Sequence, residues 1–154
     1  MCGICGELRF DGRAPDRATL ATMTEKLARR GPDASGHYIS GPLAFGPRRL
    51  AVIDLSDRSA QPMVDDDLGL ALVFNGTIYN YPELREQLRG KGYLCSSDGD
   101  TEVIRKAYAE WGEDCPRHLQ GVFAFAIWNA RKQQLFMARD RFGVKPYYYS
   151  LTRQ

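Results

Sequence analysis

The feature that most restricts the fold is a segment whose apolar side chains point to both sides of a strand. Residues 122–128 read Val-Phe-Ala-Phe-Ala-Ile-Trp, and another apolar segment follows after a short polar link. This spacing predicts an antiparallel hairpin formed by Gly121–Trp128 and Gln134–Arg139. Because both faces of the hairpin are apolar, helices must cover one face and a second sheet the other. The sequence therefore predicts an α+β fold, a four-layer αββα sandwich of two mainly antiparallel sheets.

Short segments separated by turn residues can supply these layers. Leu70, Leu72 and Phe74 alternate with Ala71 and Val73, as in a strand with two different faces. Further strands are expected by the same criteria, and the predicted set is Cys2–Phe10, His37–Ser40, Leu43–Gly46, Arg49–Asp54 and Gly69–Asn75. Helices are predicted after the capping residue Asp16, after a capping box at Asn80-Tyr-Pro-Glu83, and over Thr101–Trp111.

The length and charge of the chain exclude several classes of protein. At 154 residues the chain fits one domain, residues 1–154, and can bury a core without disulfide bonds. Its 21 Lys and Arg nearly balance its 19 Asp and Glu, which gives no electrostatic reason to expect a nucleic acid or membrane partner. No apolar run approaches the ~20 residues of a membrane helix, and four Cys do not suit a secreted disulfide scaffold. We therefore expect a cytoplasmic protein.

The usual motifs of nucleophilic catalysis are missing from the sequence. His37 and His118 lie in unrelated segments, and there is no G-x-S-x-G, P-loop or H-E-x-x-H pattern. Cys2-Gly-Ile-Cys5 has the spacing of a zinc or redox site, but the other Cys and His residues are not spaced as further ligands. A thioredoxin-like pair would also open a helix, whereas the sequence after Cys5 resembles a strand. We therefore predict no metal site and no cofactor in this domain.

Cys2 follows Met1, and removal of the initiator Met would make it the N-terminal residue. A free α-amino group has a pKa of about 7.7–8.0, so about half of it is neutral near physiological pH and can act as a base. Such an amine can take the proton of the thiol and later protonate a leaving group. One residue then supplies both nucleophile and base, and no His is required. Cys2 is therefore the candidate catalytic nucleophile.

Four further residues could complete a site that cleaves an amide. Asn75-Gly76 can direct a side-chain amide and a backbone N–H at one oxygen, or can form a two-residue hairpin turn. Arg49 can hold a carboxylate with two hydrogen bonds, or can be a solvated residue at a strand end. Asp100 precedes a predicted helix and can simply cap it. The residue types alone leave these alternatives open.

The motifs run in order through the whole chain. They are Met1-Cys-Gly-Ile-Cys-Gly6, Arg30-Gly-Pro-Asp-Ala-Ser-Gly36, Arg49-Leu50, Asp54, Gln61-Pro62, Asn75-Gly-Thr-Ile-Tyr-Asn80, Gly99-Asp-Thr-Glu-Val103 and Arg139-Asp-Arg-Phe-Gly-Val-Lys-Pro146. Together they resemble class II glutamine amidotransferases, and most closely the N-terminal glutaminase domain of glutamine-dependent asparagine synthetases.

The resemblance implies an N-terminal-nucleophile hydrolase fold in which Cys2 attacks the side-chain amide of glutamine. It implies that Asn75 and Gly76 form the oxyanion hole, that Arg49 binds the glutamine carboxylate, and that Asp100 binds its amino group. Ammonia would then pass to a C-terminal synthetase domain that uses ATP and magnesium to activate a carboxylate, which is aspartate in asparagine synthetases. The resemblance leaves open whether the protein is a homodimer.

Two features depart from the family pattern. The synthetase domain lies outside this chain, and we expect the glutaminase domain itself to be incomplete at its C-terminus. Thr77 stands where the family usually has Glu, which helps to hold the substrate amino group. A subgroup that amidates the dipeptide N-acetylglutaminylglutamine looks similar and also lacks that Glu, so this acceptor is an alternative to aspartate. A glutamine-binding module without catalytic activity is the alternative from another class of function.

Overall fold

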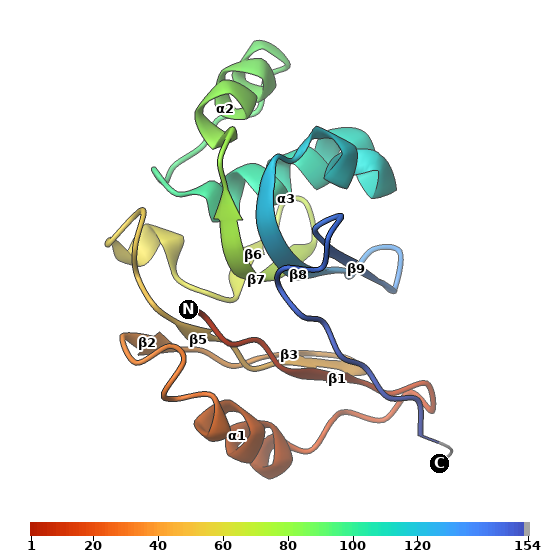
Figure 1. The fold of residues 1–154 in the computed structure, drawn as a ribbon. Helices are drawn as coiled ribbons and strands as arrows, with labels where there is room; N and C mark the ends of the chain where they lie inside the picture. Colours follow the sequence, from red (N-terminus) through yellow and green to blue (C-terminus); the bar gives the residue numbers. More distant parts are fainter. Residues whose placement is uncertain (153–154) are drawn as a thin grey trace.

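Two layers of antiparallel strands lie face to face in the structure, a computed structural model that describes residues 1–152 (Figure 1). One layer holds the sheet of strand order β1-β4-β3, formed by Gly6–Leu8, Leu43–Phe45 and Tyr38–Ser40, and the pair β2-β5, formed by Ala34–Ser35 and Arg48–Arg49. The other layer is the sheet of order β6-β7-β8-β9, formed by Met63–Asp65, Leu70–Ile78, Gly121–Asn129 and Gln134–Arg139.

Helices cover the outer face of each layer (Figure 1). Helix α1 (Arg17–Lys26) lies against the β1-β4-β3 sheet, and α2 (Tyr81–Gly90) and α3 (Asp100–Trp111) lie on the side of the β6–β9 sheet. Short 3₁₀ segments, η1 (Asp57–Ser59) and η2 (Gly112–His118), follow β5 and α3. The predicted order of helices, sheet, sheet and helices is confirmed.

Strands β7 and β8 form the centre of the structure because both of their faces are buried. Leu72 and Phe74 of β7 pack with Phe125 of β8 against the helices, in a core that α2 and α3 complete. Val73 of β7 and Trp128 of β8 point the other way and pack between the two sheets. The alternation seen in the sequence therefore corresponds to two separate cores, one on each side of the β7–β8 pair.

The helix ends are confirmed in part. Asp16 caps α1, and its carboxylate accepts a hydrogen bond from the Thr19 backbone N–H at 2.7 Å. Asn80 stands at the N-cap position of α2, but the predicted capping box is wrong, because its side chain makes no capping hydrogen bond. The Asn80 amide instead donates to the His118 carbonyl and accepts from the Gln120 N–H, which ties the start of α2 to the start of β8.

Three of the predicted strands differ from the observed ones, and β2 and β6 were not predicted. The segment predicted as Cys2–Phe10 forms only the short β1, although Gly3 pairs with Arg48 before it. The strand predicted over Arg49–Asp54 is wrong beyond Arg49, since the chain turns away from the sheet and leaves Val52 72% exposed. Conversely, β7 runs past the predicted end at residue 75 to residue 78, because β8 continues to pair with it.

The packing between the two sheets predicts a large difference between two Phe→Ala substitutions. Phe45 is 3% exposed and belongs to the core between the sheets, whereas Phe10 is 83% exposed. We expect Phe45→Ala to lower the free energy of unfolding by about 3–5 kcal/mol because it leaves a cavity, and Phe10→Ala to change it by less than about 0.5 kcal/mol. Urea denaturation of both variants checks this, and equal effects would contradict the packing described here.

Candidate active site

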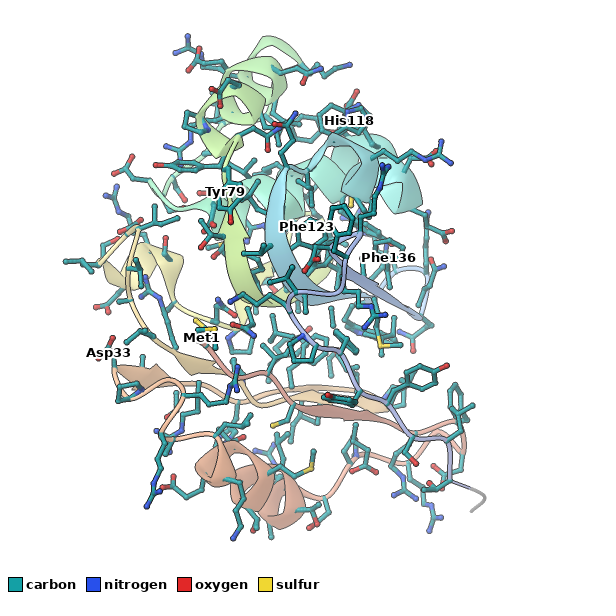
Figure 2. All side chains as sticks on the ribbon, viewed as in Figure 1. Met1, Asp33, Tyr79, His118, Phe123 and Phe136 are labelled. Carbon is teal, nitrogen blue, oxygen red and sulfur yellow. The ribbon has the colours of Figure 1, made fainter. Side chains whose placement is uncertain are left out.

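One pocket contains every residue that the sequence singled out for chemistry. It is lined by Cys2 from the N-terminal segment, Arg49 from β5, Asn75 and Gly76 from β7, and Asp100 from the start of α3. The pocket lies at the edge of the sandwich where these elements meet, and Figure 2 shows Met1 at that edge, between the two layers of strands. Residues from four separate parts of the chain are thus brought together by the fold.

The Cys2 thiol is half-buried in this pocket and contacts the backbone of Leu50. Its Sγ lies 3.4 Å from the Leu50 N–H nitrogen and 3.7 Å from the Leu50 carbonyl oxygen. The backbone hydrogen bonds between Gly3 and Arg48, both 2.8 Å, fix the segment that carries Cys2. The Leu50 backbone and the pairing of Gly3 with Arg48 therefore hold the Cys2 sulfur in place at the pocket.

Cys5 has a different environment from Cys2, although the two form a C-x-x-C motif. The Cys5 thiol donates to the Gly46 carbonyl at 2.9 Å and faces Thr24 of α1. Burial raises the pKa of the Cys5 thiol, which disfavours the thiolate. Both thiols are free, and residues 1–152 contain no group of three or more His, Cys, Asp and Glu side chains that could hold a metal ion. The geometry of this motif therefore supports a packing role for Cys5.

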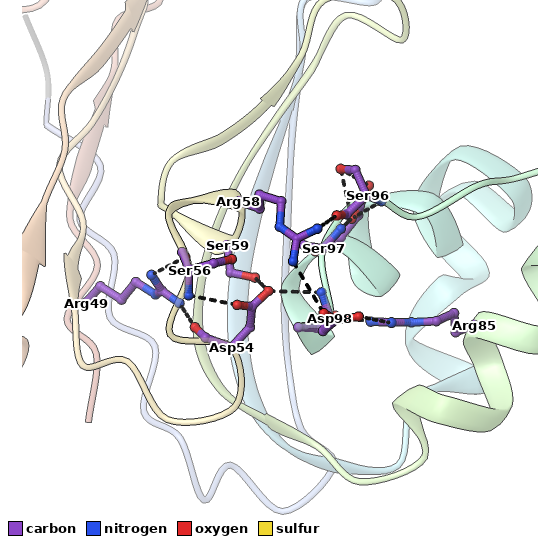
Figure 3. Close-up of polar contacts among 11 residues, drawn as sticks. Arg49, Asp54, Ser56, Arg58, Ser59, Arg85, Ser96, Ser97 and Asp98 are labelled. Carbon is purple, nitrogen blue, oxygen red and sulfur yellow. Dashed lines mark hydrogen bonds and ion pairs between the residues drawn. The ribbon is translucent and has the colours of Figure 1, made fainter.

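Arg49 presents a positive charge without a negative partner. Its guanidinium donates to the backbone carbonyls of Asp54 and Ser56 (Figure 3). Among residues 1–152 no carboxylate forms an ion pair with it, and the side chain is buried. A guanidinium held in this way can bind a carboxylate through two hydrogen bonds.

Asp100 is the opposite case, a buried carboxylate without a cation. Its Oδ2 accepts a hydrogen bond from the Ile78 backbone N–H at 2.9 Å, and no Lys, Arg or His within residues 1–152 pairs with it. Burial raises the pKa of Asp100 above its ordinary value. Gly99 occupies the N-cap position of α3, and Asp100, the first residue of the helix, directs its carboxylate to the Ile78 N–H of β7. A positively charged group of a ligand would restore charge balance here.

Asn75 and Gly76 lie in the middle of β7 and not in a turn. They pair with Ala124 and Phe123 of β8, so the hairpin-turn alternative is wrong. A Cβ on Gly76 would lie 2.2 Å from the Val122 carbonyl oxygen, which explains why glycine is required at this close approach. The Asn75 side-chain amide makes no hydrogen bond within the described part of the chain, so it can donate to a ligand.

Two residues of the pocket, Asp54 and Lys145, and one residue outside its lining, Asp140, had no role in the sequence prediction. The Asp54 carboxylate accepts one hydrogen bond from within its own turn and another from a segment distant in the sequence. Lys145 reaches the N-terminus, with its Nζ 2.9 Å from the Met1 Sδ. Asp140 lies outside the pocket lining and holds the turn that carries Lys145, because its carboxylate accepts the Lys145 N–H at 2.9 Å. All three residues lie within motifs of the family resemblance, and those motifs are the sequence signal that points to them.

Comparison with known proteins agrees with this architecture. The family described as "Glutamine amidotransferase domain" matches residues 1–154. Asparagine synthetase [glutamine-hydrolyzing] 3 of Bacillus subtilis is 42% identical over 153 residues, which cover 97% of this chain and 25% of that protein. Amidase chry2 of Gibberella zeae is 37% identical over 98% of this chain and 24% of its own length. A solved structure of glutamine phosphoribosylpyrophosphate amidotransferase from B. subtilis superposes with a TM-score of 0.54 and 25% identity, over 66% of this chain and 24% of that chain.

The fold and the pocket define an αββα sandwich of the N-terminal-nucleophile hydrolase type. Within that class, the chain belongs to the glutamine amidotransferase domain family. It spans about a quarter of the length of the curated relatives it matches. No helix formed by residues 1–152 has both the length and the apolar character needed to cross a membrane.

The raised pKa of Asp100 predicts a stability effect that depends on pH. Between the ordinary value of 3.8 and the raised value, the folded protein binds more protons at this site than the unfolded chain, so its stability falls as pH rises through that window. Asp100→Asn removes the ionisable group, so it should raise the free energy of unfolding at pH 7, with a gain that shrinks toward about pH 4. Urea denaturation at several pH values measures this.

Asp66→Asn is the control for this experiment, because Asp66 is exposed. It should change the stability little at any pH. A gain from Asp100→Asn that did not depend on pH, or a loss at pH 7, would show that burial does not destabilise the ionised carboxylate.

Proposed function

We propose that this domain hydrolyses glutamine to glutamate and ammonia, with Cys2 as the nucleophile. The observation that carries the proposal is a single pocket that combines a thiol, a guanidinium without a carboxylate partner and a buried carboxylate without a cation. The two charged groups suit the carboxylate and ammonium of an α-amino acid, and the thiol suits attack on its side-chain amide. Membership of the glutamine amidotransferase domain family supports glutamine as that amino acid.

In the proposed mechanism, Met1 is removed and the α-amino group of Cys2 takes the thiol proton. The thiolate attacks the side-chain carbonyl carbon of glutamine, and the carbonyl electrons move onto the oxygen. Asn75 and Gly76 supply the N–H donors for this oxyanion. When the tetrahedral species collapses, the α-ammonium returns its proton to the leaving nitrogen, which departs as ammonia. Water then cleaves the thioester on Cys2 and releases glutamate.

For the rest of the protein, we propose that the ammonia passes to an ATP-dependent synthetase domain that forms an amide, with aspartate as acceptor. Two relatives over 97% of this chain carry the name asparagine synthetase [glutamine-hydrolyzing], and this chain corresponds to only a quarter of their length. ATP and magnesium are thus assigned to that domain, whose chemistry forms an acyl-adenylate. A cytoplasmic location remains part of this proposal.

The proposed nucleophile is tested by comparing its two neighbouring thiols. Cys2→Ala should abolish release of glutamate from glutamine, because no other group in the pocket is a comparable nucleophile. Cys5→Ala should keep most of the activity, since Cys5 contacts Gly46 and Thr24 instead of the pocket. Mass spectrometry should find that Met1 is removed and that a glutamine-like alkylating analogue labels Cys2. Full activity with Met1 retained, or labelling of Cys95 or Cys115 instead, would contradict the proposal.

Arg49 and its neighbour Arg48 make a matched pair for testing the substrate carboxylate. Arg49 lines the pocket, whereas Arg48 points to α1 and pairs with Glu25. Loss of a desolvated partner for a carboxylate costs on the order of 2–5 kcal/mol. Arg49→Ala should therefore raise the KM for glutamine more than about tenfold, while Arg48→Ala should change it little. Similar small effects from both substitutions would remove Arg49 from the binding site.

Thr77 tests how the substrate amino group is held. It lines the pocket where the family usually has Glu, which leaves Asp100 as the proposed partner of the ammonium. A hydrogen bond to a charged group contributes about 1.5–3 kcal/mol, so Thr77→Glu should lower the KM for glutamine roughly tenfold with little change in kcat. Glutamine titration measures this. An unchanged or higher KM would favour a subgroup with a rearranged pocket, such as the dipeptide amidases.

A further inference from the structure

A third charged side chain, Asp54, lies in the pocket between Arg49 and Asp100. It is 8% exposed and lines the same cavity. We propose that Asp54 is a positioning residue that sets the separation between the Arg49 guanidinium and the Asp100 carboxylate, and so selects an α-amino acid as substrate. This inference rests on the proposed glutamine hydrolysis, because it assigns those two groups to the two ends of the substrate.

On one side, the Asp54 carboxylate fixes the turn whose backbone carbonyls accept the hydrogen bonds of Arg49. Its carboxylate accepts the Ser56 N–H at 2.8 Å and the Ser59 hydroxyl at 2.8 Å, which closes the turn over residues 54–59 (Figure 3). The carbonyls of Asp54 and Ser56, both within this turn, receive the hydrogen bonds of Arg49. The direction of the guanidinium therefore depends on the turn, and the turn depends on the Asp54 carboxylate.

On the other side, Asp54 reaches the segment that carries Asp100. Its Oδ2 accepts the backbone N–H of Asp98 at 2.9 Å, across 44 positions of sequence (Figure 3). Gly99 follows directly and packs on the same group, since a Cβ there would lie 2.5 Å from the Ser59 Oγ and 3.4 Å from the Asp54 Cβ. Asp100 is the next residue and begins α3. One carboxylate thus joins the Arg49 turn to the start of the helix that presents Asp100.

The chemistry of the substrate makes this separation important. A single carbon atom joins the carboxylate and the ammonium of an α-amino acid, so their two protein partners must keep a fixed spacing. Hydrogen bonds from Ser56, Ser59 and Asp98 also lower the pKa of Asp54, so it keeps its charge and its acceptor role at neutral and mildly acidic pH.

The test separates recognition of the amino acid end from the general reactivity of Cys2. Two electrophiles are used on the purified protein with Cys2 at its N-terminus: 6-diazo-5-oxo-norleucine, which carries an α-amino acid group, and iodoacetamide, which does not. Asp54→Asn replaces one acceptor oxygen with a donor that faces donors. Asp57→Asn is the matched control, because Asp57 is in the same turn and its exposed side chain makes no hydrogen bond within residues 1–152.

For Asp54→Asn we expect the alkylation rate constant with the diazo amino acid to fall at least about tenfold, and the rate with iodoacetamide to change less than twofold. The KM for glutamine should rise by a similar factor with kcat nearly constant, the pattern of lost uniform binding. Asp57→Asn should match the unaltered protein in every assay. If Asp54→Asn fails to fold, Ser59→Ala removes one of the three hydrogen bonds and should raise the KM about threefold.

Two results would overturn the inference: equal losses with both electrophiles, which indicate a general loss of structure, or an unchanged KM in both Asp54→Asn and Ser59→Ala. Failure of the proposed function looks different, because the unaltered protein would then neither release glutamate nor react faster with the diazo amino acid than a generic thiol does.

Discussion

The burial of both faces of the β7–β8 pair is the constraint on which the rest of the structure depends. Large side chains such as Phe125 fill the face toward the helices, and Trp128 fills the face toward the other sheet. Neither face of such a strand pair can be exposed to solvent, so another layer of structure must cover each face. The edge of the resulting sandwich is where β7, the N-terminal segment and the start of α3 converge, and the pocket lies there. The position of the chemistry is therefore a consequence of how the core is covered.

The parts of the fold that follow from local pattern could be predicted from the sequence, and the parts that depend on distant partners could not. The alternation through β7 is local, as is the pattern that predicts a helix over Thr101–Trp111, and both elements form, with β7 extending beyond its predicted end. The apolar residues after Arg49 have the composition of a strand, but hydrogen bonds from Arg49 and within the Asp54 turn bend the chain instead. Asn75-Gly76 has the composition of a turn, yet pairing with β8 keeps it extended. Tertiary contacts overrode local preference in both cases.

In the candidate site, too, some features could be predicted from the sequence and others depend on distant contacts. The identity of its residues came from family motifs, and the structure brings all of them to one pocket. Their relative geometry could not be read from the sequence, because it depends on contacts such as that between Asp54 and the Asp98 backbone, which are remote in sequence and use main-chain groups. A backbone N–H is present at every residue except proline, so no residue type identifies the one that Asp54 will contact.

A buried charge outside the pocket has ion-pair partners that the charges inside the pocket lack within the part of the chain that the structure describes. Arg105 is as buried as Arg49, but it is paired with Glu102 and Asp65 at 3.4 and 3.2 Å. A buried charge without a partner is costly, and Arg105 avoids that cost through its two ion pairs. In the pocket Arg49 and Asp100 remain unpaired with each other and with neighbours in residues 1–152. Opposite charges held apart in one cavity lose stability in the empty site and regain it when a ligand carrying both complementary charges binds. Under the proposed function, this arrangement favours a zwitterion over a molecule with a single charge, because only the zwitterion compensates both groups at once.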